Sequence, residues 1–150
     1  MQITINDLKN VTISGVRTVF SDSCETYKEN YFEWTAFPLV SELQTTKVMT
    51  GLLQGWHHTP DFDVIETHAD NEIFYFIEGT AIMLFIDINE GQPVLESAQI
   101  VRISAGTTIE IAKGKGHFVA VAQDNMFKAL VVSPVQDAPR ISLPEVISGE

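Results

Sequence analysis

Cysteine is almost absent from this chain of 150 residues, in which Cys24 is the only one. A single cysteine excludes a disulfide bond within the chain, and it also excludes a thiolate metal site, which needs several cysteines. A catalytic thiol needs an activating neighbour, and the residues around Cys24 supply none. We therefore expect Cys24 to be a small side chain that is buried or half-buried.

Basic residues are also scarce, because 9 Lys and Arg stand against 20 Asp and Glu and give a formal net charge of −11. No cluster of Lys or Arg interrupts this acidic charge. Phosphate backbones and anionic lipid surfaces would be repelled by such a protein. We therefore expect neither a nucleic-acid partner nor a membrane partner.

Long apolar runs are missing as well. The longest uninterrupted run extends from Ala81 to Ile86, far short of the ~20 residues that a membrane-spanning helix needs. The opening segment MQITINDLKN lacks the basic and apolar regions of a signal peptide. The sequence therefore predicts a soluble, cytoplasmic protein.

The hydrophobic share of 45% is sufficient for one sizeable core, and we expect a single domain over residues 1–150. The apolar runs are short, rich in Val, Ile, Phe and Thr, and separated by Gly, Asn and Asp. They predict strands at Lys47–Leu53, Val64–His68, Ile73–Glu78, Ala81–Ile88, Gln99–Ile103, Thr108–Ile111, Phe118–Ala122 and Phe127–Val132, with shorter ones at Gln2–Ile5, Val11–Ile13 and Val16–Phe20. Helix signals are weak, and we expect only one or two helical turns in Asp22–Tyr31 and another in Val40–Thr45.

Many short strands at fairly even spacing are typical of an all-β sandwich or barrel. The runs IFYFI and AIMLFI are apolar on both faces, so one face must line an interior and the other must meet another sheet or a partner. Between them, Gly79-Thr80 predicts a tight hairpin and hence antiparallel pairing. A closed antiparallel β-barrel or jelly roll with a few short helical turns fits best. From Pro134 on, three prolines predict an extended C-terminal tail that packs on the barrel or on a neighbour.

Two of the four histidines, His68 and His117, lie in contexts that indicate a metal site. On a strand, Glu66 and His68 would point to the same face, about 6–7 Å apart at the backbone. Glu72 follows His68 by four residues, which is about 13 Å in a straight strand and too far for a shared ion. The turn residues Ala69-Asp70-Asn71 supply the necessary bend, so that His68 closes one strand and Glu72 opens the next. His117 would then arrive from a distant strand across the barrel.

These residues resemble the two motifs of the cupin superfamily, G-x5-HxH-x3,4-E-x6-G and G-x5-PxG-x2-H-x3-N. The chain matches the end of the first motif at His68, Glu72 and Gly79, and it matches the second motif at Gly106, Gly114 and His117. Ala112 and Val121 replace the proline and the asparagine of the second motif. The resemblance covers about residues 47–132 and implies a single cupin domain, with N-terminal strands before this core and the extended tail after it.

In cupins the motif residues bind a divalent metal, so the resemblance implies His68, Glu72 and His117 as ligands. Glu66 stands where the family usually has its first histidine, and it is either a fourth ligand or a catalytic base. Imidazole and carboxylate ligands without a thiolate suit Fe²⁺, Mn²⁺, Ni²⁺ or Zn²⁺.

The remaining polar candidates have plainer interpretations. His57 and His58 follow a tryptophan in a turn and are expected in a loop, although His58 at the barrel mouth is an alternative. Lys113 and Lys115 are expected at a hairpin tip, where they either protect an edge or favour a carboxylate substrate. Three aromatic side chains should fill the barrel, and the first two share the strand face of Glu72: Phe74, Phe76 and Phe85.

The cupin fold hosts many activities, so fold alone does not decide function. One hypothesis is a divalent-metal-dependent enzyme, a lyase, isomerase or dioxygenase, that acts on a small polar or carboxylate metabolite. A narrower resemblance, to the ureidoglycolate lyases of purine catabolism, rests on Glu66-Thr67-His68 and implies release of glyoxylate and urea. The other hypothesis is a non-catalytic, metal-free barrel that binds a small ligand in the same pocket. Because cupin dimers often pair N-terminal strands and Gln2–Ile5 is available, we also expect a homodimer.

Overall fold

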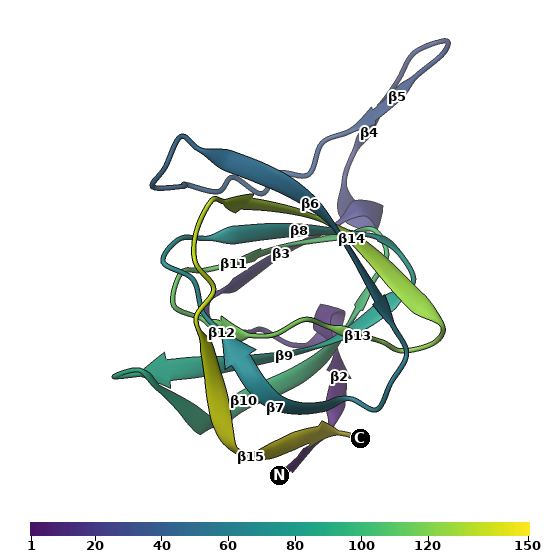
Figure 1. Ribbon diagram of the computed structural model, residues 1–150. Coiled ribbons are helices and arrows are strands. Elements are labelled where there is room, and N and C mark those ends of the chain that lie inside the picture. Colours follow the sequence, from purple (N-terminus) through teal and green to yellow (C-terminus); the bar gives the residue numbers. More distant parts are fainter.

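Two β-sheets face each other and enclose the core of the protein, as the computed structural model of residues 1–150 shows (Figure 1). The eight-stranded sheet contains β1 (Gln2–Ile3), β2 (Ile5–Asp7), β7 (Asp61–Glu66), β9 (Thr80–Asn89), β10 (Gln92–Ser104), β12 (Gly116–His117), β13 (Val121–Ala122) and β15 (Arg140–Gly149). The five-stranded sheet contains β3 (Val16–Phe20), β6 (Val48–Trp56), β8 (Glu72–Glu78), β11 (Thr107–Ile111) and β14 (Met126–Pro134). The remaining elements are a hairpin of β4 (Thr26–Lys28) and β5 (Glu33–Thr35), and two 3-10 turns, η1 (Leu8–Asn10) and η2 (Ser21–Ser23).

The order of the strands brings distant segments together. The larger sheet runs β1-β15-β7-β12-β9-β10-β2, with β13 paired to β9, and the smaller sheet runs β3-β11-β8-β14-β6. Most of the pairs are antiparallel. The all-β jelly roll that the sequence predicts is thereby confirmed.

Strand β9 shows why the sequence carries residues that are apolar on both faces. Met83 and Phe85 point into the core between the two sheets, whereas Ile82 and Leu84 belong to a second apolar cluster. That second cluster also contains residues of β7, β10 and β15, so both faces of β9 are covered by the same chain. Full burial of such side chains contributes about 1.5–3 kcal/mol each.

The connection at Gly79 differs from the hairpin that the sequence predicts. Strand β8 pairs with β11 and β14, whereas β9 pairs with β10, so the two neighbouring strands lie in different sheets. Gly79 has a φ of 74°, and a Cβ at this position would overlap the carbonyl oxygen of Met126. Only glycine fits this corner. The hairpin prediction was wrong because β8 and β9 face each other across the core, where the inner faces of both are buried.

The predicted helical turns are mostly absent. Only η2 overlaps the start of Asp22–Tyr31, which continues into β4, and Val40–Thr45 contains no helix. Threonine, tyrosine and valine in these segments favour extended backbone over helix. The strand predicted at Val11–Ile13 is also absent, and the one predicted at Phe118–Ala122 shortens to β13.

The C-terminal segment packs on its own barrel as a full strand. β15 pairs antiparallel with β7, and β1 pairs parallel with β15. Pro144 falls where the β15–β7 ladder is interrupted between Ser142 and Ile147, a position at which a missing N–H is tolerated. The N-terminal strands β1 and β2 likewise pair with β15 and β10 of the same chain. No helix in the structure combines the length and the apolar character that a membrane crossing requires.

Candidate metal centre

Four ionisable residues from both sheets meet at one point of the barrel. Glu66 is the last residue of β7, and His117, which ends β12, is its register partner in the larger sheet. Glu72 opens β8 in the smaller sheet, and His68 lies on the short connection from β7 to β8. The chain therefore bends between His68 and Glu72 as the sequence predicts, and the four candidate residues converge.

The oxygen Oε2 of Glu72 lies between the two imidazoles, 2.9 Å from Nε2 of His68 and 3.2 Å from Nε2 of His117. Glu66 is set back, with its Oε1 3.7 Å from Nε2 of His68 and 4.0 Å from Nε2 of His117. The imidazole planes are tilted, with ring centres 5.2 Å apart. Donor atoms of Glu66, His68 and His117 all lie within 4.8 Å of one another, a spacing at which they can share one metal ion.

Backbone carbonyls fix the orientation of both imidazole rings. Nδ1 of His117 lies 3.0 Å from the carbonyl oxygen of Lys115, and Nδ1 of His68 lies 3.3 Å from that of Asp137. A carbonyl oxygen only accepts, so each Nδ1 must carry the hydrogen and donate it. Each Nε2 therefore faces the carboxylates, and such outer hydrogen bonds are how proteins orient metal-binding histidines.

The site is buried, and the protonation state of each of its residues depends on the charges of the others. Burial lowers the pKa of His68, but the carboxylates of Glu66 and Glu72 outweigh it and raise that pKa from 6.5 to about 10. Burial raises the pKa of Glu72, but His117 and His68 outweigh it and lower that pKa from 4.5 to about 2. The side chains of His68, Glu72 and His117 are all at most one-tenth exposed.

The residues present fit a metal ion. With Nδ1 protonated, a neutral imidazole turns its Nε2 lone pair toward the Glu72 carboxylate, and two lone pairs at this distance repel. A cation, either a proton or a metal ion, must therefore lie between them. Nε2 of His68 is buried and makes no well-directed hydrogen bond, although Glu72 is close. Two imidazole nitrogens and two carboxylates are also a donor set that divalent transition metals accept.

A set of polar contacts that the sequence interpretation missed holds the bend between His68 and Glu72. The Asp70 carboxylate accepts from the backbone N–H of Gln44, and the Asp70 N–H donates to Gln136. Asn71 accepts from the N–H of Lys113 through its side-chain oxygen. The only signal in the sequence was the turn-forming character of Asp70 and Asn71, because their partners are distant along the chain.

A small cavity of about 160 Å³ adjoins the site. Glu66, Glu72 and His117 form its polar end. The rest of its wall is apolar and consists of Leu53, Phe74, Met83, Phe118, Val119 and Val131. Of the aromatic residues expected inside the barrel, Phe74, Phe76 and Phe85 are all buried in the core, and Phe74 lines this cavity.

The side chains of the other polar candidates do not line the site. His57 and His58 are exposed after the end of β6, as expected for loop residues. Lys113 is exposed in its turn, but Lys115 is buried and its Nζ lies 2.6 Å from the Asp87 carboxylate. Lys115 is therefore not the edge-protecting lysine that the sequence predicts, because its stem packs inward and only a counter-ion makes that burial tolerable.

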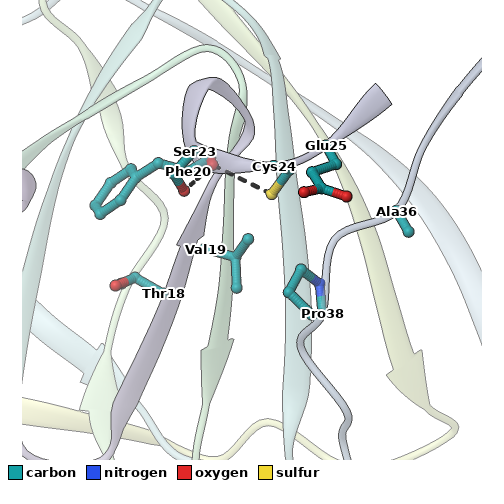
Figure 2. A pocket seen from close by; sticks show the side chains of 8 residues that line it. All are labelled: Thr18, Val19, Phe20, Ser23, Cys24, Glu25, Ala36 and Pro38. Atoms are coloured by element: carbon teal, nitrogen blue, oxygen red, sulfur yellow. Dashed lines mark hydrogen bonds between the residues drawn. The ribbon is translucent and has the colours of Figure 1, made fainter. Parts of the chain in front are cut away.

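Cys24 lies at a separate, open cavity of about 470 Å³ beside β3 (Figure 2). This cavity is lined by Thr18, Val19, Phe20, Ser23, Cys24, Glu25, Ala36 and Pro38. The Cys24 thiol is half-buried and donates to the carbonyl oxygen of Phe20 at 3.4 Å. The lining contains no basic group to activate a thiolate, so the geometry agrees with a structural cysteine.

Two facing sheets enclose one core in an all-β jelly roll, and the residues of the two motifs that resemble those of cupins meet at one buried point. No family model matches the chain, and no curated protein matches its sequence. Among solved structures, it is similar to RmlC from Streptococcus suis, solved in complex with dTDP-D-xylose, with 11% identity, coverage of 81% of this chain and 65% of that one, and a TM-score of 0.49.

Two further similarities are of the same order. The 3,4-ketoisomerase QdtA from Thermoanaerobacterium thermosaccharolyticum shows 9% identity, coverage of 84% of this chain and 85% of that one, and a TM-score of 0.49. Oxalate decarboxylase from Bacillus subtilis shows 18% identity, coverage of 65% of this chain and 24% of that one, and a TM-score of 0.46. This chain thus spans about two thirds of the RmlC chain and about a quarter of the oxalate decarboxylase chain.

Proposed function

We propose that this protein is a metal-dependent enzyme that binds one divalent ion at His68, Glu72, His117 and Glu66 and acts on a small molecule in the adjoining cavity. One observation carries the proposal. Two buried imidazoles, each fixed through Nδ1 by a backbone carbonyl, turn Nε2 toward the same carboxylate oxygen. An arrangement of this kind needs a cation at its centre, and a divalent ion is the cation that uses all four donors.

The four residues have two different roles. His68, His117 and Glu72 hold the ion, because their donor atoms are nearest to one another. Glu66 is set back from both imidazoles and its side chain is 19% exposed at the edge of the cavity. It is thus the fourth ligand or, when a substrate is bound, the group that accepts a proton from it. A bound divalent ion supplies Lewis acidity to a coordinated oxygen of the substrate.

The cavity supports a compact substrate with one polar end and an apolar body. Its volume of about 160 Å³ lies below the ~300–1,000 Å³ of pockets that hold drug-sized ligands. Six of the nine lining residues are hydrophobic, and the polar ones gather at the metal centre. Two carboxylates offset the charge of a divalent ion, so a substrate carboxylate would be held by coordination rather than by long-range attraction.

Metal content tests the proposal. Protein purified without chelators or a histidine tag should carry up to one divalent ion per chain, measured by plasma mass spectrometry. The double change His68→Ala with His117→Ala should abolish this metal, whereas His57→Ala with His58→Ala should leave it unchanged, because those two histidines are exposed outside the site. If the wild-type protein carries no metal and takes up none at micromolar concentrations, a metal-free ligand-binding barrel becomes the better account.

The ureidoglycolate lyase hypothesis has its own test. Metal-loaded protein is incubated with ureidoglycolate, and glyoxylate release is followed against the spontaneous rate. Release that depends on the metal and is lost in the double histidine variant would support this reaction. A rate equal to the spontaneous one, with metal bound, would remove the lyase and leave the broader proposal in place.

A further inference from the structure

Strand β6 leaves one of its two edges unpaired. It has nine residues and a single ladder partner, β14, so it forms one end of the five-stranded sheet. At the other end of that sheet, β3 has five residues and carries Arg17, which donates to the carbonyl oxygen of Val40. An edge that is long and lacks protection is a template for pairing with another strand.

The outward face of β6 is apolar and exposed. Val48, Leu52 and Trp56 lie on one face of β6, separated by Thr50 and Gln54, and Leu130 of β14 is the register partner of Leu52. Leu52 and Trp56 are each 64% exposed, and Leu130 is 38% exposed. We refer to Val48, Leu52, Trp56 and Leu130 as the β6 face. Exposed large apolar side chains that gather in one place mark an interaction site rather than ordinary surface.

The acidic residues of the chain lie outside strand β6. Although the chain has 20 acidic residues, none falls within residues 43–60, a segment that includes all of β6. Two copies of a protein with a net charge of −11 repel each other over most of their surface. The edge of β6 is a place where they can approach without bringing carboxylates of the contacting strand together.

The β4–β5 hairpin, which follows β3 at the other end of this sheet, carries further exposed apolar surface. It projects away from the side of the barrel that the five-stranded sheet forms (Figure 1). Its aromatic side chains are largely exposed, and Tyr31 and Trp34 are 91% and 65% exposed. A projecting hairpin with exposed aromatic residues is marginal in water unless another surface covers it.

We propose that the β6 face is the contact surface for a second copy of this chain, with the two β6 strands paired antiparallel across a two-fold axis. Antiparallel pairing of identical strands is self-complementary, which is what a two-fold dimer requires. It joins the two five-stranded sheets into one continuous sheet and brings the two β6 faces side by side. The segment without acidic residues favours another copy of this chain as the partner, because a cationic partner would need carboxylates to bind. The N-terminal strands β1 and β2 also lie at the ends of their sheet, but they have only two and three residues and offer a much shorter edge than β6.

Sedimentation velocity over a range of protein concentrations tests this surface. The wild-type protein should sediment as a dimer of the 16.7 kDa chain and dissociate on dilution. Leu52→Glu and Trp56→Glu should each raise the dissociation constant at least about tenfold, because each would bury a carboxylate in the apolar contact. Val146→Glu is the matched control, since Val146 is a similarly exposed apolar residue on β15. It should leave the dissociation constant unchanged.

Hydrogen exchange of the wild-type protein provides a measurement that does not depend on folding of the variants. The β6 amides should exchange more slowly at high than at low protein concentration, while the amides of β3 should not respond. A monomer at every concentration, or a dimer that Leu52→Glu and Trp56→Glu weaken no more than Val146→Glu does, would overturn the proposal. Concentration-independent exchange in β6 would also overturn it.

Discussion

Oε2 of Glu72 lies 2.9 Å from Nε2 of His68, although a straight strand would separate residues four apart by about 13 Å. The bend between them is what makes a shared ion possible. It also places a buried imidazole against a buried carboxylate, so the protonation of each group depends on the other. That dependence gives the metal-free protein a defined response to pH.

We predict that the mutual stabilisation of His68 and Glu72 in the metal-free protein is greatest between about pH 4.5 and 6.5. The pKa of His68 is raised from 6.5 to about 10, so its contribution is complete below pH 6.5 and is lost as the pH rises through 10. The pKa of Glu72 is lowered from 4.5 to about 2, so its contribution is complete above pH 4.5 and is lost as the pH falls through 2.

Urea unfolding in the presence of a chelator measures this response. The difference in unfolding free energy between wild type and His68→Asn should shrink as the pH rises above 6.5. For Glu72→Gln the corresponding difference should shrink as the pH falls below 4.5. Differences that stay constant from pH 3 to pH 10 would contradict the assignment of both shifts to this pair.

The ligand role of Glu66 predicts a loss of metal affinity on removing its charge. Glu66→Gln keeps the size of the side chain but removes the negative donor, and we expect metal affinity to fall at least about tenfold. Glu66→His supplies the donor that cupins usually have there and should retain more of the affinity. Competition with a chelating dye measures both variants. Unchanged affinity in Glu66→Gln would show that Glu66 is not a ligand and would leave it the role of a base.

The ion pair between the buried Lys115 and the half-exposed Asp87 predicts an asymmetric response to mutation. Asp87→Ala leaves the Lys115 ammonium buried without its partner, and we expect it to cost about 1–3 kcal/mol of unfolding free energy. Lys115→Met keeps the apolar stem and leaves Asp87, which is half-exposed, in contact with water, so it should cost less. Urea unfolding of the two single variants and the double variant checks this. Equal costs for the single variants would contradict it.

Gly79 and Gly91 form a matched pair for testing the corner between the sheets. Both have a positive φ, of 74° and 78°, but only at Gly79 would an added Cβ meet backbone atoms. Gly91→Ala should therefore cost about 1 kcal/mol from backbone conformation alone. Gly79→Ala should cost clearly more, about 2–4 kcal/mol, because the chain must also move away from Met126. Thermal or urea unfolding measures both, and equal destabilisation would contradict the steric argument.

Short-range patterns in the sequence predicted much of this architecture. The doubly apolar run from Ala81 to Ile86 required two buried faces, and β9 has them. The bend at Ala69-Asp70-Asn71 could be predicted because turn-forming residues interrupt a β-strand pattern there. The resemblance to the two cupin motifs grouped His68 and Glu72 with His117, and the structure places their side chains together.

The features that the sequence did not predict depend on contacts between residues that are distant along the chain. The run after Gly79 indicated a strand but not which sheet it would join, and adjacency in sequence suggested the wrong partner. Lys115 gave no sign of burial, because its counter-ion Asp87 lies 28 residues earlier. The carbonyl oxygens that orient the imidazoles belong to the backbone, so no pattern of side chains in the sequence predicts these contacts.

The connection from β14 to β15 has a consequence for the order of events during folding. It supplies the carbonyl oxygen of Asp137 to His68 and the side chain of Gln136 to Asp70, contacts that span 69 and 66 residues of chain. Contacts of such long range form late, since the entropy of closing the intervening loop must be offset first. We expect His68 to acquire the orientation that the Asp137 carbonyl fixes only once the segment between β14 and β15 is in place. We therefore expect the ion to be captured by an almost finished barrel, rather than to nucleate folding as zinc does in small metal-dependent domains.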